Sequence, residues 1–191
     1  MRIAQEQRKT KETEIALELC LDGGPVQVST GIGFFDHMLT AMAVHGGFGL
    51  KLKTVGDLDV DCHHTVEDTG IVLGRAFARA IGDKAGIARF GSFYVPMDES
   101  LGFAALDFSG RGHLVFDAVF QQERVGAFDT CMTGEFFRAF AVNAGLTLHL
   151  RLLYGTNAHH GIEALFKAAG HALKQAVRIE GGAVLSTKGT L

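Results

Sequence analysis

The sequence predicts an α+β fold made of two similar halves. A His-His-x-x-Glu motif occurs twice, at residues 63–67 and 159–163, and the copies lie 96 positions apart in a chain of 191 residues. A stretch with helical periodicity contains each copy. Each half reads as strands, helix, strand and helix, so two helices can cover one face of a small, mostly antiparallel sheet. We therefore expect one compact domain made of two internally duplicated repeats, at residues 1–92 and 93–191.

The elements of the first repeat follow from alternation, turn residues and apolar spacing. Residues 2–9 and 13–21 alternate well enough to form two strands, and the Asp-Gly-Gly-Pro turn at 22–25 ends the second. The glycines at positions 46 and 47 end the first helix. The other predicted elements are a strand, a helix, a strand and a helix, at residues 26–29, 34–44, 48–54 and 62–81.

The second repeat returns to the same order of elements. Ile162 and Leu173, on the apolar face of its last helix, lie 96 positions after Val66 and Phe77 on the earlier helix. This match of the buried faces extends the duplication beyond the motif itself. The predicted elements are strands at residues 93–96, 100–108, 113–120 and 146–153, helices at 131–142 and 158–179, and a loop from 181 onward.

Composition and charge exclude several classes of protein. With 47% hydrophobic and 20% charged residues the chain can build a core, and it has no apolar run long enough to span a membrane. A net charge of −3 without a basic tract argues against nucleic acid as a partner. The N-terminus lacks the apolar segment of a secretory signal, and three scattered cysteines suit a reducing compartment. We expect a cytoplasmic protein.

Helical geometry gives the His-His-x-x-Glu motif its chemistry. On a helix the Glu lies four residues after the first His and three after the second, so it can share a metal ion with either. Adjacent histidines point about 100° apart, so both need not bind the same ion. One copy alone is weak evidence, because surface helices often carry His and Glu. Two copies at equivalent positions indicate metal binding, since a duplicated core residue would be apolar.

A second pair of positions extends the predicted ligand set. Aligning Gly47 with Gly145 matches His37 of the first repeat with Glu135 of the second, at an offset of 98. Eight donors are too many for one first-row ion and suit two ions with positions left open for a substrate, and Mn, Fe and Zn all accept such donors. The predicted metal ligands are His37, His63, His64, Glu67, Glu135, His159, His160 and Glu163.

Side chains outside these ligands give weaker signals. Several basic residues lie near turns or near the metal helices, and a hydroxyl and amine cluster at residues 186–189 could bind a phosphate. A solvated surface is the simpler explanation unless these residues converge on the metals. Four histidines lack a duplicated partner and are expected to be structural: His45, His113, His149 and His171.

Four longer motifs closely resemble those of the imidazoleglycerol-phosphate dehydratase family of histidine biosynthesis. They lie at residues 33–39, 61–70, 95–99 and 186–189, and the resemblance covers essentially the whole chain. It implies sheets on the outside with the helices packed between them. It also implies two Mn²⁺ ions per active site and a hollow homo-oligomer, a 24-mer of cubic symmetry, with sites formed between subunits. The implied reaction is the loss of water from imidazole glycerol phosphate, which gives imidazole acetol phosphate.

Carried over residue by residue, the resemblance assigns metal binding to all the predicted ligands except Glu135. It matches Glu12 with a carboxylate that touches the substrate, which makes Glu12 a candidate for moving the proton, together with Glu67 and Glu163. Two cations on the deprotonated imidazole ring would make that ring an electron sink. The implied contacts to the substrate phosphate are Arg89, Arg111, Lys167, Ser186 and Lys188, and Thr187 of the 186–189 cluster is a further candidate for binding the phosphate.

Two positions depart from the family pattern. Glu135 stands where the family usually has His, and Ala41 stands where it commonly has Gln, which removes an amide from the phosphate site. Mn²⁺ accepts oxygen ligands, so Glu135 can still bind it. The extra negative charge leaves a divergent member with reduced activity as one alternative. The others are a binuclear metal-dependent hydrolase of a small phosphate ester, and a metal-storage protein or a structural metal at a subunit contact.

Overall fold

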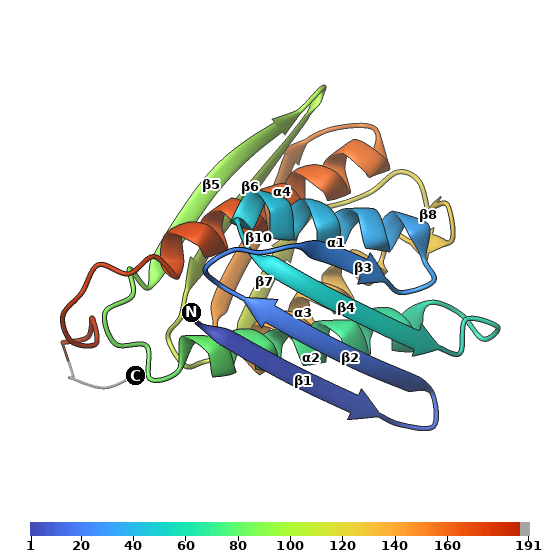
Figure 1. Ribbon diagram of the computed structural model, residues 1–191. Coiled ribbons are helices and arrows are strands. Elements are labelled where there is room, and N and C mark those ends of the chain that lie inside the picture. Colours follow the sequence, from blue (N-terminus) through green and yellow to red (C-terminus); the bar gives the residue numbers. More distant parts are fainter. Residues whose placement is uncertain (188–191) are drawn as a thin grey trace.

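The computed structural model of the chain, which describes residues 1–187, has two four-stranded sheets on the outside and four helices between them (Figure 1). The helices are α1 (Gly33–Gly46), α2 (His63–Ile81), α3 (Met132–Ala144) and α4 (Ala158–Ala176). The α+β prediction, with two similar halves and the helices inside, is confirmed.

The first sheet contains the strands of the first repeat in the order β1-β2-β4-β3. Strands β1, β2 and β4 are antiparallel neighbours, whereas β3 runs parallel to β4. Buried and exposed residues alternate along β2 because one face of the sheet packs on α2. The bounds are β1 (Ile3–Lys9), β2 (Thr13–Cys20), β3 (Val26–Ser29) and β4 (Gly49–Gly56).

The second sheet repeats this topology with the order β5-β6-β10-β7. Its last strand, β7, again runs parallel to its neighbour, β10. The duplication therefore extends to strand order and strand direction. The bounds are β5 (Phe90–Met97), β6 (Ser100–Asp107), β7 (His113–Asp117) and β10 (Thr147–Tyr154).

Three element ends differ from the prediction by three residues. Strand β5 begins at Phe90 rather than at residue 93, β7 ends at Asp117 rather than at 120, and α4 ends at Ala176 rather than at 179. Val177 N donates to Leu173 O, but Ile179 pairs with Ile87 in an isolated β-bridge, and the strand-like pairing stops the helix. A short hairpin, β8 (Arg124–Val125) with β9 (Phe128–Asp129), was not predicted.

The helices pack in pairs that each take one helix from each repeat: α1 lies against α4, and α2 against α3. Aromatic rings fill these contacts, with Phe77 and Phe140 meeting edge to face at 5.3 Å between ring centroids. Each such buried ring stabilises the fold by about 1.5–3 kcal/mol. The two repeats therefore share one core.

Two glycines at duplicated positions let the paired helices approach closely. A Cβ on Gly74 of α2 would lie 2.6 Å from the carbonyl oxygen of Phe140 on α3, and one on Gly170 of α4 would lie 2.5 Å from that of Met42 on α1. Both distances are shorter than real Cβ atoms tolerate. The close packing of the helix pairs therefore depends on the missing side chains.

The described helices include none that is both long and apolar enough to cross a membrane.

Candidate metal centre

The first group of metal-ligand side chains joins α1 to α4. It consists of His37 on α1 with His159 and Glu163 on α4, and their ligand atoms lie within 4.8 Å of one another. Glu163 Oε2 lies 3.5 Å from His37 Nε2 and 3.3 Å from His159 Nε2. This cluster, called site A below, offers two imidazoles and one carboxylate, a donor set that fits a first-row divalent ion.

The carboxylate of site A is buried and held by a lysine. Glu163 is only 5% exposed. Its Oε1 oxygen forms an ion pair with Lys167 Nζ at 2.7 Å. Burial raises the pKa of Glu163, but the hydrogen bond and charge of Lys167 outweigh it, with help from His37 and His159, and the pKa falls below its usual value. Glu163 is therefore an anion, with Oε2 turned toward the histidines.

The second group joins α2 to α3. It consists of His63 and Glu67 on α2 with Glu135 on α3, again with ligand atoms within 4.8 Å. His63 Nε2 lies 3.5 Å from Glu67 Oε2. This cluster, called site B, offers one imidazole and two carboxylates, which suits a harder ion such as Mn²⁺.

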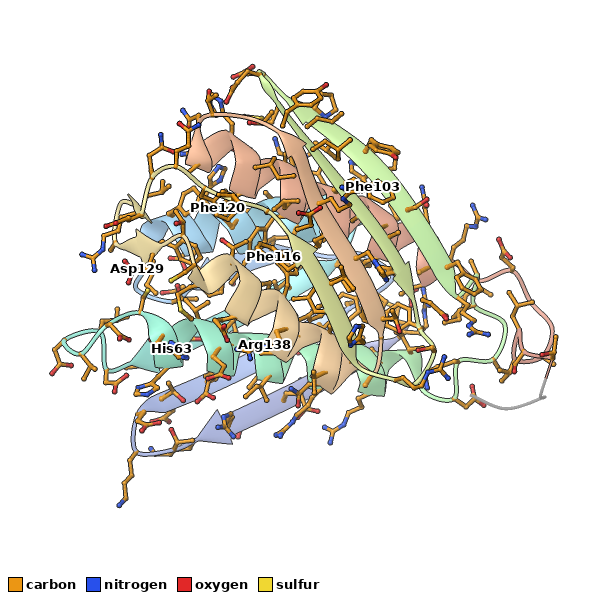
Figure 2. All side chains as sticks on the ribbon, turned by 180° about the vertical axis from the view of Figure 1, so that it is seen from behind. His63, Phe103, Phe116, Phe120, Asp129 and Arg138 are labelled. Carbon is orange, nitrogen blue, oxygen red and sulfur yellow. The ribbon has the colours of Figure 1, made fainter. Side chains whose placement is uncertain are left out.

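Arg138, labelled on α3 in Figure 2, lies one turn from Glu135 and forms an ion pair with its Oε2. That oxygen is buried and accepts no aligned hydrogen bond from the residues that the structure describes. The Arg138 guanidinium is therefore the cation paired with Glu135, as Lys167 is with Glu163.

Local capping places both motifs on the first turn of a helix. Asn157 caps α4 and accepts a hydrogen bond at 2.9 Å from the backbone N–H of His159. Asp61 accepts a similar bond at 2.7 Å from the backbone N–H of His63. Such side chains satisfy the free donors at a helix start. The motif side chains therefore project at the N-terminal ends of α2 and α4.

The second histidine of each motif lies outside its own cluster. His64 Nδ1 is 3.0 Å from Asp57 Oδ2, and His160 Nδ1 is 2.7 Å from Glu99 Oε2. These hydrogen bonds raise the pKa of both imidazoles. Of the eight predicted ligands the structure thus brings six together, as two groups of three, and turns His64 and His160 toward loop carboxylates.

The predicted phosphate contacts divide between the two ends of the molecule. Lys167 lies at site A, whereas Arg89 pairs with Asp107 at 2.6 Å and donates a backbone hydrogen bond to Ala176 O at the far end of α4. Because a helix rises about 1.5 Å per residue, Ala176 lies roughly 20 Å from Glu163. Arg89 Nη1 also donates to Leu185 O, next to Ser186 and Thr187.

Arg111 lies at the same far end as Arg89. It follows β6, and its backbone carbonyl accepts hydrogen bonds from Ser109 and Thr147. Lys188 lies outside the described residues. Within one chain, therefore, the described members of the predicted phosphate set other than Lys167 do not converge on either cluster.

Two histidines expected to be structural contact each other. His45 Nδ1 at the end of α1 lies 3.1 Å from His171 Nε2 on α4, and the ring of His171 stacks on Phe93 at 4.2 Å between centroids. Neither histidine has a duplicated partner, so repeat analysis could not pair them.

Comparison with known proteins identifies the family of the chain. Residues 30–173 match the model of the family described as imidazoleglycerol-phosphate dehydratase. Proteins of that name from Lacticaseibacillus casei and Methanosarcina mazei are 57% and 58% identical to the chain, with complete coverage of both partners in each case. The chain belongs to the imidazoleglycerol-phosphate dehydratase family.

Solved dehydratase structures share the whole fold. The enzyme from Staphylococcus aureus superimposes with a TM-score of 0.85 at 42% identity, covering 93% of this chain and 99% of that one. The enzyme from Pyrococcus furiosus, solved in complex with (S)-C348, gives 0.86 at 35% identity and covers 97% and 100%. The two-sheet architecture around paired helices is therefore the dehydratase fold.

The prediction missed three charged side chains beside the motifs: Asp57, Glu99 and Arg138. Helical spacing identifies Arg138, which is three residues from Glu135. Glu99 ends one of the motifs that resemble the dehydratases, although its contact with His160 joins the turn between β5 and β6 to α4, 61 residues further along the chain. No periodicity links Asp57 to His64, because Asp57 lies in a loop.

Proposed function

We propose that the chain converts imidazole glycerol phosphate into imidazole acetol phosphate and water. Membership in the dehydratase family makes it a hydro-lyase of histidine biosynthesis. The observation that carries the proposal for this chain is the pair of His and Glu clusters, built at duplicated positions and each bridging two helices.

The proposed cofactor is Mn²⁺, with two ions per active site. His37, His159 and Glu163 would hold one ion, and His63, Glu67 and Glu135 the other. Their mixed imidazole and carboxylate donors fit such an ion, and the ligand atoms of each group lie within 4.8 Å of one another. When bound, the ions would supply positive charge that stabilises the anionic form of the substrate imidazole.

The remaining steps belong to side chains of the protein. A hydroxyl must leave one glycerol carbon and a proton the next, after which the enol becomes the ketone. Glu12 is the proposed proton carrier, because its carboxylate is 53% exposed and accepts no hydrogen bond from the described residues. Glu163 and Glu67 lie in the clusters, so we assign them to metal binding first.

We propose that complete active sites form between subunits of a large homo-oligomer. Within one chain Arg89 and Arg111 lie at the opposite end from the clusters, roughly 20 Å along α4. Phosphate contacts from a neighbouring copy would solve this problem, and His64 and His160 would complete clusters in the same way. The 24-mer of cubic symmetry and the cytoplasmic location remain part of this proposal.

Product analysis tests the function. The full-length protein, loaded with Mn²⁺, would be incubated with imidazole glycerol phosphate and the product identified by mass spectrometry and NMR. We expect a ketone that is lighter than the substrate by one water and that retains its phosphate. Release of inorganic phosphate would contradict the dehydratase and favour the binuclear hydrolase. Chelator-treated protein is the control and is expected to be inactive.

A further inference from the structure

Strand register shows that Glu12 and Glu99 occupy equivalent positions in the two repeats. The left-handed glycines Gly47 and Gly145 end α1 and α3, and β4 and β10 each begin two residues later. The first residue of β4 pairs with the last of β2, and the first of β10 pairs with the last of β6. Strands β2 and β6 are both eight residues long, and Glu12 and Glu99 directly precede them.

These equivalent carboxylates have different environments. Glu99 accepts hydrogen bonds from His160 Nδ1 at 2.7 Å, from Asn157 N at 2.9 Å and from Thr156 N at 3.3 Å. Glu12 comes no closer than 4.0 Å to His64 Nε2. Glu99 is therefore fixed in place, and Glu12 is not.

Asp57 contacts Nδ1 of His64 in the same way that Glu99 contacts Nδ1 of His160. Both of its carboxylate oxygens lie near His64 Nδ1, at 3.0 and 3.2 Å. The equivalent position after β10 is Gly155, where even a Cβ would collide with the side chain of Ser100. The second repeat therefore has no room for a carboxylate at this position and uses the one before β6.

We infer that Asp57 and Glu99 are positioning residues that fix the rings of His64 and His160, and that Asp57 thereby leaves Glu12 free for proton transfer. Each carboxylate accepts the Nδ1–H of its histidine, which directs the unprotonated Nε2 outward as a metal donor. The inference rests on the proposed function. It adds that, of the two carboxylates at equivalent positions, Glu99 positions a histidine and Glu12 transfers the proton.

Three near-isosteric variants of the full-length protein test this assignment: Glu12→Gln, Glu99→Gln and Asp57→Asn. Mn²⁺ affinity, measured by equilibrium dialysis with metal analysis, is expected to fall about 10- to 100-fold in Glu99→Gln and Asp57→Asn. Glu12→Gln is expected to keep wild-type Mn²⁺ affinity and KM while its kcat falls about 10²- to 10⁴-fold. Thermal unfolding checks that each variant is folded, and Asp57→Glu, which keeps the charge, is expected to recover part of the affinity.

Three outcomes would overturn the inference. Glu12→Gln could lose Mn²⁺ affinity as Glu99→Gln does, or the two supporting variants could bind Mn²⁺ like the wild type. Wild-type protein that binds no Mn²⁺ would also end it. Failure of the proposed function looks different: a wild-type protein that binds two ions per chain but forms no ketone. The affinity comparison needs no substrate and can still be read in that case.

Discussion

At the scale of single residues, Glu135 makes the two metal clusters unequal. It occupies the position in the second repeat that His37 occupies in the first, so site A has two imidazoles and site B two carboxylates. Each cluster also has one cation against a carboxylate, Lys167 in site A and Arg138 in site B. Site B therefore carries one more negative charge and favours oxygen-preferring ions.

This inequality predicts two classes of Zn²⁺ site. Zn²⁺ prefers imidazole more than Mn²⁺ does, so metal-free protein is expected to bind a first Zn²⁺ at site A at least about tenfold more tightly than a second at site B. Glu135→His should bring the two affinities together. Competition with a chromophoric chelator measures both constants. Equal Zn²⁺ affinities in the wild type, or loss of an ion in the variant, would contradict the prediction.

The contact between His45 and His171 predicts that stability depends on pH. Burial lowers the pKa of both rings below the usual 6.5, and Lys167 adds to this for His45. As the pH falls, these two histidines therefore bind protons at a higher pH in the unfolded chain than in the folded chain. The contribution of this pair to the free energy of unfolding is fully present above about pH 6.5. It declines as the pH falls toward the pKa values of the two rings in the folded state.

Urea unfolding between about pH 7.5 and 5 measures this effect. We expect acidification to lower the free energy of unfolding more in the wild type than in the His171→Gln variant. His64 and His160, whose pKa values are raised, contribute the opposite slope equally in both proteins. His149→Gln, at an exposed position of β10, is the control and should keep the wild-type slope. An unchanged slope in His171→Gln would rule out the pair as the cause.

At the scale of elements, the helix pairs position the clusters. Site A needs α1 and α4 in contact, and site B needs α2 and α3, so the helix separation sets the distance between ligands. Gly74 and Gly170 allow this separation, because each lies against a backbone carbonyl of the partner helix.

Substituting either glycine with Ala is expected to destabilise the fold. Ala gains about 1 kcal/mol over Gly in intrinsic helix propensity. A methyl group forced against a backbone carbonyl costs about 1–3 kcal/mol, and here neither helix can move without disturbing its sheet. We expect a lower Tm for Gly74→Ala and Gly170→Ala in thermal unfolding. Gly33→Ala is the matched control, since a Cβ added there would meet no atom within 4 Å, and its Tm should stay the same or rise.

At the scale of the whole molecule, assembly and metal binding are predicted to depend on each other. If histidines from one copy complete clusters in another, removal of metal weakens the contacts between subunits. Light scattering of the purified protein should therefore show smaller particles after EDTA treatment and recovery on adding Mn²⁺. His64→Gln should lower the particle mass even with Mn²⁺ present. Full-size particles after complete metal removal would show that the two are independent.

The fold could be predicted from the sequence because the apolar spacing that indicates each helix occurs twice, once in each repeat. The faces of α2 and α4 are amphipathic, and the spacing of Val66 and Ile162 identifies them without any structure. The β8–β9 hairpin escaped prediction because strands of two residues have no periodicity. The end of α4 was also misplaced, because the pairing of Ile179 with Ile87 is a long-range contact.

The candidate site was predictable in residue type but not in grouping. Helical spacing joins His63 to Glu67 and His159 to Glu163, and the duplication adds His37 and Glu135. Neither pattern indicates which helices pack against each other, so the division into two clusters could be seen only in the structure. The orientation of His64 and His160 depends on carboxylates in distant loops, which no local pattern reveals.

Both clusters draw their donors from both repeats: site A takes His37 from the first and two residues from the second, and site B takes Glu135 from the second and two from the first. A half-length ancestor with the same helices could have built neither cluster within a single chain. Two identical copies, packed through these helices, would have built both with two-fold symmetry. Fusion of two such copies into one chain would preserve both clusters and would let Glu135, Asp57, Glu12 and Glu99 differ from their counterparts in the other repeat.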